Sequence, residues 1–232
     1  MTVFVRDQVH LSHIRLASTL ATLTEGEARR PSLLPGWSVG HVLTHLARNA
    51  DSHVRMLEAA ARGEVADQYP GGNEQRAADI EAGARRPAAE LVDDVLASAA
   101  RLEAVWDATP GDAWPTGQGR VVGGIWPVAE LPFRRWREVE IHHVDLDLRY
   151  GFADWPDDYV DADLARCIAG LPDRLPAGTA VAIEATDTGD RWAVPEGPVE
   201  AQPVHAERRV LLAWLVGRSK AAGLPTLGRW TA

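Results

Sequence analysis

A carboxylate and an imidazole, those of Glu138 and His142, stand four residues apart in the segment 137–146, where charged residues and histidines are dense. An α-helix turns by about 100° per residue, so side chains four residues apart lie about 40° apart, one turn along the same face. Two such side chains can bind one metal ion, as carboxylates and histidines do in the cores of helix bundles. Because two ligands do not complete a site, a third must come from another helix.

The segment that begins at Ser38 offers the third ligand, since it carries His41, His45 and His53. His45 stands between two leucines on the apolar side of the predicted helix, so we expect it to face the interior. His41 falls in the first turn, where it can simply be exposed, and His53 lies about 80° around the helix from His45. A set of two histidines and one glutamate with an open position suits a catalytic zinc ion or a similar divalent metal.

The same residues are also compatible with other interpretations. A glutamate and a histidine occur four apart on many helices by chance, and a histidine on an apolar face is often only a packed core residue. Alternatively, His53 would join His45, Glu138 and His142 in a closed shell of four ligands. That shell would favour a structural metal in a non-catalytic binding or regulatory protein.

Helices are predicted to position these residues in the first two-thirds of the chain. Apolar residues recur at helical spacing, Ser38 is placed to cap one helix, and Gly151 is placed to end another. The predicted helices span residues 9–23, 38–62, 74–84, 87–106 and 132–150. The glycine- and proline-rich segment 109–124 is predicted to be a long loop.

The pattern changes after residue 152. Two short apolar runs flank a turn, and helical spacing precedes and follows them. The predicted elements are a helix over 159–171, strands over 179–185 and 191–194, and a helix over 205–220. The sequence therefore predicts an α+β protein, with a helix bundle over residues 1–152 and a smaller α+β domain over residues 153–232.

Composition excludes several classes of function. Of 232 residues, 33 are acidic and 24 are lysine or arginine, and the resulting net charge of -9 argues against binding to nucleic acid or to an anionic membrane. Cys167 is the one cysteine, so no disulfide can form within the chain, and its apolar surroundings favour a buried structural thiol over a nucleophile. Without a signal pattern or a long apolar stretch, we expect the protein in the cytoplasm.

Several segments resemble the mycothiol-dependent maleylpyruvate isomerases, which belong to the DinB-like superfamily of metal-binding helix bundles. The segments that carry this resemblance are residues 34–38, 44–51, 69–72, 74–84, 137–146 and 211–218. The resemblance extends through most of the chain. It implies a DinB-like four-helix bundle followed by the smaller domain.

The resemblance also implies roles for individual residues. His45, Glu138 and His142 match the zinc ligands of the family, His53 remains a substitute for His45, and Arg218 matches a functional arginine near the C-terminus. The implied cofactors are zinc, or another divalent metal, and the low-molecular-weight thiol mycothiol.

The implied reaction is thiol addition to the cis double bond of maleylpyruvate, rotation about the new single bond, and elimination to fumarylpyruvate. Arg218 would hold a carboxylate of this small molecule by bidentate pairing. The alternative within the same chemistry is a mycothiol S-transferase, which would join the thiol to an electrophile without releasing it.

Overall fold

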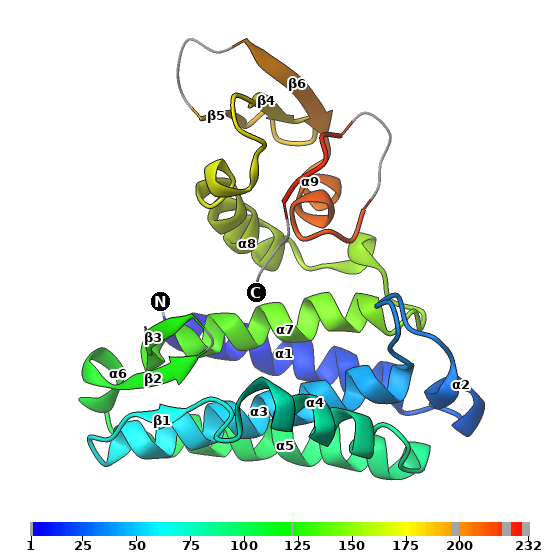
Figure 1. The fold of residues 1–232 in the computed structure, drawn as a ribbon, viewed down its shortest axis with the longest axis vertical. Helices are drawn as coiled ribbons and strands as arrows, with labels where there is room; N and C mark the ends of the chain where they lie inside the picture. Colours follow the sequence, from blue (N-terminus) through cyan, green and yellow to red (C-terminus); the bar gives the residue numbers. More distant parts are fainter. Residues whose placement is uncertain (1, 122, 196–199, 220–223, 229–232) are drawn as a thin grey trace. The chain divides into compact units, whose positions relative to one another are not determined.

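The computed structural model describes residues 2–121, 123–195, 200–219 and 224–228. The chain forms two compact units, Met1–Tyr150 and Gly151–Ala232 (Figure 1). Unit 1 is mainly helical, and unit 2 combines helices with a small sheet. This architecture confirms the predicted fold class, a helix bundle followed by a smaller α+β domain.

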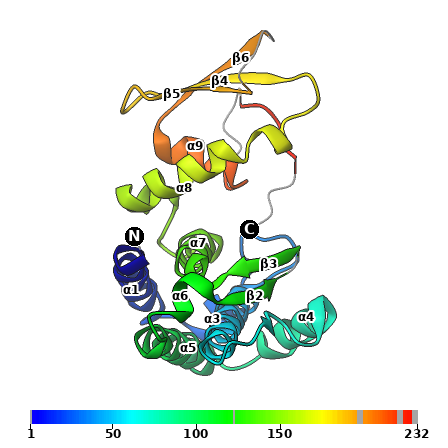
Figure 2. The same ribbon diagram turned by 90° about the vertical axis from the view of Figure 1, so that its left-hand side faces the viewer.

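Four long helices form the bundle of unit 1. They are α1 (Thr2–Leu20), α3 (Val39–Ala61), α5 (Ala88–Ala108) and α7 (Leu131–Asp145). Both α1 and α3 pack against α5 and against α7, so each helix has two neighbours, as Figure 2 shows. The short α2 (Glu25–Arg29) precedes α3, and α4 (Gly72–Gly83) packs on α3 from outside the bundle.

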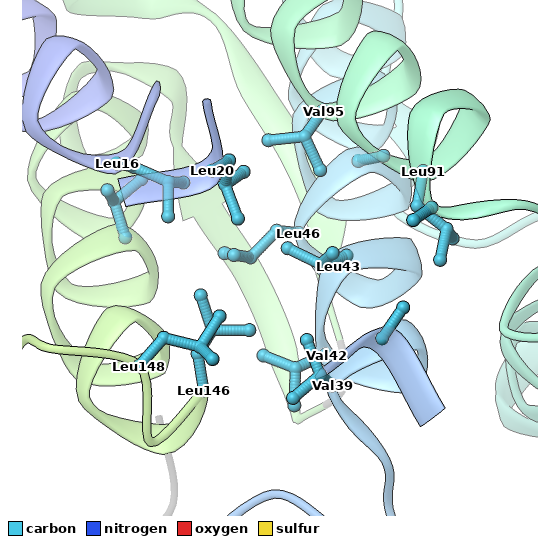
Figure 3. Close-up of a cluster of buried hydrophobic side chains, with 14 residues drawn as sticks. Leu16, Leu20, Val39, Val42, Leu43, Leu46, Leu91, Val95, Leu146 and Leu148 are labelled. Carbon is cyan, nitrogen blue, oxygen red and sulfur yellow. The ribbon is translucent and has the colours of Figure 1, made fainter. Parts of the chain in front are cut away.

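The core of the bundle is a cluster of aliphatic side chains from its inward helix faces (Figure 3). Within α3, Val39, Val42, Leu43 and Leu46 repeat at helical spacing and are fully buried. They meet side chains of α1, α5, α7 and the turn that follows α7, namely Leu16, Leu20, Leu91, Val95, Val139, Leu146 and Leu148. Each buried leucine or valine contributes about 1.5–3 kcal/mol to the stability of the fold.

The start of α3 confirms the predicted cap. The hydroxyl of Ser38 accepts a hydrogen bond from the backbone N–H of His41, and the backbone N–H of Ser38 donates to Nδ1 of His41 at 3.1 Å. These two bonds satisfy N–H groups that a helix start otherwise leaves without partners. His41 is therefore part of the cap, and its Nε2 lies 3.0 Å from Glu81.

The prediction that residues 132–150 form one helix is wrong at its end. The helix α7 stops at Asp145, and the backbone then takes positive φ angles at Asp147 (54°) and Arg149 (47°). These left-handed conformations cannot continue a right-handed helix.

The prediction of a long loop over residues 109–124 is also wrong. This part of unit 1 contains α6 (Ala113–Thr116) and the strands β2 (Gln118–Val121) and β3 (Gly124–Pro127). Strand β2 pairs antiparallel with β3 and parallel with β1 (Ala66–Asp67), and the 3₁₀ turn η1 (Val128–Glu130) leads into α7. A Cβ at Gly119 would lie 2.5 Å from the sulfur of Met56, so glycine here reflects a strand packed closely on α3.

The described residues of unit 2 form a three-stranded sheet, two α-helices and two short 3₁₀ turns. Its elements are η2 (Phe152–Asp154), α8 (Asp157–Ala169), η3 (Pro172–Arg174), β4 (Ala180–Ala185), β5 (Arg191–Val194), β6 (Ala201–Ala206) and α9 (Arg208–Leu215). The predicted hairpin is confirmed, because β4 pairs antiparallel with β5. Cys167 is buried in α8, as expected.

The predicted helix over 205–220 is wrong at both ends, although Lys220 itself lies outside the described residues. His205 belongs to β6, which pairs parallel with β4, and α9 begins at Arg208 and ends at Leu215. Strand β6 lies at the sheet edge, where a proline such as Pro203 is tolerated. Among the described residues, no helix is long and apolar enough to cross a lipid bilayer.

Candidate metal centre

Helices α3 and α7 bring His45, Glu138 and His142 together. Nε2 of His45 lies 2.8 Å from Oε2 of Glu138 and 3.1 Å from Nε2 of His142. The remaining separation, between Oε2 of Glu138 and Nε2 of His142, is 3.4 Å. Within the part of the chain that the structure describes, these three side chains form the group able to hold a metal ion.

The spacing of these atoms fits a metal ion. Ligand atoms about 2.0–2.1 Å from a tetrahedral zinc ion lie about 3.3 Å from one another. The three observed separations lie on either side of that value, and two imidazole nitrogens with one carboxylate oxygen form a common zinc set. The residues therefore fit a divalent metal with at least one open position.

Protonation also favours binding of a metal. Burial lowers the pKa of His45 to about 4, so its ring is neutral at neutral pH. Burial would raise the pKa of Glu138, but the neighbouring His45 and His142 outweigh burial and hold that pKa well below its usual value. Neutral imidazole and ionised carboxylate are the forms that bind metals.

His142 differs from His45. Burial would lower the pKa of His142, but hydrogen bonds to Asp145 and Glu138 outweigh it and raise that pKa. A metal that binds through Nε2 of His142 would have to displace any proton on that nitrogen.

Two side chains orient the histidines from behind. Oδ2 of Asp145, which is only 1% exposed, lies 2.8 Å from Nδ1 of His142, and Nη2 of Arg76 lies 3.0 Å from Nδ1 of His45. The ring of Trp37 lies beside His45, with 5.7 Å between ring centroids. The sequence interpretation missed all three of these residues. Only Asp145 left a readable signal, because it follows His142 by three residues on the same helix.

Two other predicted site residues lie outside this group. His53 is buried, but it is not among the residues whose ligand atoms converge. Nδ1 of His53 makes no hydrogen bond to any described residue. Arg218 belongs to unit 2, where its Nη1 donates to the backbone carbonyl of Val216 at 2.8 Å.

A comparison with sequence families decides the relationship of the chain. The family model described as the mycothiol maleylpyruvate isomerase N-terminal domain matches residues 9–147, more than half of the chain and all three converging side chains. The chain belongs to the mycothiol maleylpyruvate isomerase family. The resemblance found in the sequence is thus confirmed, whereas no curated protein matched the chain.

Solved structures give the same fold. Two crystal structures, of a mycothiol-dependent maleylpyruvate isomerase and of a histidine-to-alanine mutant, each match with a TM-score of 0.87 and 24% identity. The match covers 99% of this chain and 97% of each of those chains. Both units of this isomerase-family protein therefore have counterparts in proteins of the same fold.

Proposed function

We propose that the protein is a zinc- and mycothiol-dependent cis–trans isomerase that converts maleylpyruvate to fumarylpyruvate. The observation that carries this proposal is the convergence of His45, Glu138 and His142 on one point in a member of this family. A metal with three protein ligands keeps a position for a further ligand, which is the arrangement of catalytic rather than structural zinc.

The proposed reaction has three stages, which are thiol addition across the cis double bond, rotation about the resulting single bond, and elimination of the thiol. A divalent metal bound by the cluster would favour the thiolate form of a thiol at its open position. The chain has one thiol of its own, Cys167, and it is buried in unit 2, so the nucleophile must come from a separate molecule.

The chain's own residues prepare the cluster for this role. Of the three ligands, Glu138 supplies one negative charge and neutral histidines supply none. The ligands would therefore neutralise only half of the charge of a divalent metal. Asp145 holds the ring of His142 through Nδ1 and leaves Nε2 turned toward the other ligands. We assign to Arg218 the binding of a substrate carboxylate, since a guanidinium fits a carboxylate in two parallel hydrogen bonds.

Metal analysis together with an activity assay tests this proposal. His45→Ala and His142→Ala would each remove a ligand, and His10→Ala, with its side chain 57% exposed, is the matched control. We expect about one zinc per chain and mycothiol-dependent isomerisation in the wild type and the control, and loss of both in the two ligand variants.

The other outcomes are equally informative. Bound metal without isomerisation would contradict the proposed reaction and favour a mycothiol S-transferase. A wild-type protein without metal would contradict the metal site itself. Retention of metal in His45→Ala would show that another residue, with His53 the first candidate, is the ligand from α3.

A further inference from the structure

A pocket of ≈ 190 Å³ lies between α3 and α4. The segment that leads into α4 also contributes to it, and the lining includes Arg48, Arg55, Tyr69, Arg76 and Asp79. Arg76 links the pocket to the cluster, because the same guanidinium that lines the pocket touches the ring of His45. A ligand bound to Arg76 in this pocket would therefore be one residue away from His45, behind its ring.

The arginines of this pocket differ in their partners. Arg48 forms ion pairs with Asp94 at 2.6 Å and with Asp51 at 3.1 Å. By contrast, no carboxylate among the described residues pairs with Arg55 or Arg76. This is unusual in a chain with a net charge of -9, where acidic partners outnumber basic residues.

The contacts that Arg55 and Arg76 do make give neither guanidinium an anionic partner. Nη1 of Arg55 donates to the backbone carbonyl of Gln68 at 2.7 Å, and the guanidinium of Arg76 lies 5.4 Å from the ring centroid of Tyr69. Asp79 is the acidic pocket residue without an ion pair, and it accepts a hydrogen bond from Gln75. The pocket thus offers two arginines against one free carboxylate, a balance that favours an anionic ligand.

We propose that Arg55 and Arg76 bind one carboxylate of the substrate. This inference rests on the proposed function, which supplies a substrate with two carboxylates. Arg55 and Arg76 would then hold this carboxylate in the pocket, and Arg76 would connect it to the candidate ligand His45.

Calorimetric titration of the zinc-loaded, full-length protein tests this proposal without any reaction. The probes are maleate, a cis dicarboxylate, and maleamide, which has the same carbon skeleton without charge. The variants are Arg76→Gln, Arg55→Gln and the charge-conserving Arg76→Lys. The control is Arg85→Gln, because Arg85 is 80% exposed and pairs with Glu81 at the surface.

We expect the wild type and Arg85→Gln to bind maleate but not maleamide. Arg76→Gln and Arg55→Gln should each raise the Kd for maleate by about tenfold or more at unchanged zinc content, and Arg76→Lys by less.

Several results would overturn the proposal. They are absence of maleate binding by the wild type, an unchanged Kd in Arg76→Gln, and loss of zinc from Arg76→Gln, which would make Arg76 a support of the cluster. If Arg76→Gln does not fold, Arg55→Gln and Arg76→Lys decide. Failure of the proposed function is distinguishable, because maleate would then still bind through the arginines while isomerisation is absent.

Discussion

Asp145 holds the ring of the candidate ligand His142 from the side opposite the cluster, through a contact of 2.8 Å. In Asp145→Asn the amide keeps the shape but loses the charge that fixes this ring. We expect metal affinity to fall by about 10- to 100-fold with the fold intact. Competition with a chelator measures this change, and Asp93→Asn on the exposed face of α5 is the control. Equal affinities in the two variants would contradict the role of Asp145.

His53 makes the stability of the protein depend on pH. Burial lowers the pKa of His53 to about 3 from an unfolded value of 6.5, and the positive charge of Arg135 lowers it further. Because His53 binds a proton in the unfolded chain but not in the folded chain, the stability of the folded protein falls as the pH drops below 6.5. The expected slope from this one residue is about 1.4 kcal/mol per pH unit.

Urea denaturation of metal-free protein between about pH 7 and about pH 5 measures this slope. The chelated protein is used because metal release would otherwise add its own dependence on pH. In His53→Gln the slope should decrease by the contribution of His53. The same slope in both proteins would show that His53 is not held neutral by the fold.

Residue spacing indicated which side chains of α3 and α7 could converge, and the family resemblance chose among the alternatives that spacing left open. His142 follows Glu138 by one helical turn, and His45 is the histidine on the apolar side of its helix, so their meeting follows from the periodicity of the two helices. Arg76 could not be predicted in this way. Its contact with His45 depends on how α4 packs on α3, which no local pattern encodes.

At the scale of elements, glycine allows α3 to pass close to its neighbours. A Cβ at Gly40 would lie 2.4 Å from the backbone carbonyl of Ala84, just beyond α4, and 3.3 Å from that of Ala28 in α2. Gly40→Ala should therefore destabilise the protein by about 1–3 kcal/mol. Gly26→Ala in α2 is the matched control, because its Cβ would meet nothing within 4 Å.

Urea denaturation of both glycine variants measures the difference. Gly26→Ala should be neutral or stabilising by up to about 1 kcal/mol, since alanine is the better helix former. Similar stabilities for the two variants would show that α3 can move away from α4 at little cost.

Helices were predicted more reliably than strands, because the residues that specify a helix lie within the helix or directly before it. The start of α3 is encoded by Ser38, and its interior by aliphatic residues at helical spacing. The strand β6 was missed because its residues, including Pro203 and His205, show no clear alternation of polar and apolar types. It is held in place by β4, about twenty residues earlier in the chain, and so by a contact that is not local.

At the scale of the whole molecule, residues with proposed roles occur in each unit. The metal ligands belong to unit 1 and Arg218 to unit 2. Arg218→Ala should leave the zinc content unchanged while it lowers kcat/KM for maleylpyruvate by about 10- to 100-fold, through loss of a charge-assisted hydrogen bond. Elemental analysis and steady-state kinetics measure the two quantities.

The control for this variant is Arg191→Ala, also in unit 2, where Arg191 is 74% exposed and pairs with Glu184. It should change neither quantity. Loss of zinc from Arg218→Ala would contradict the assigned role, and so would unchanged kinetics.

The ligand pairing across α3 and α7 also has a consequence for how the chain reaches its folded state. His45 lies 93 residues before Glu138 and 97 before His142, and α4, α5, α6 and the β2–β3 hairpin lie in that interval. A metal bound to all three residues would close this long loop. Closing such a loop carries a large entropic cost in the unfolded chain. The bundle must therefore assemble before it can bind the ion, and the bound ion then stabilises the assembled bundle. At a free metal concentration of about 1,000 times its Kd, the bound ion would add about 4 kcal/mol to the stability of the folded protein.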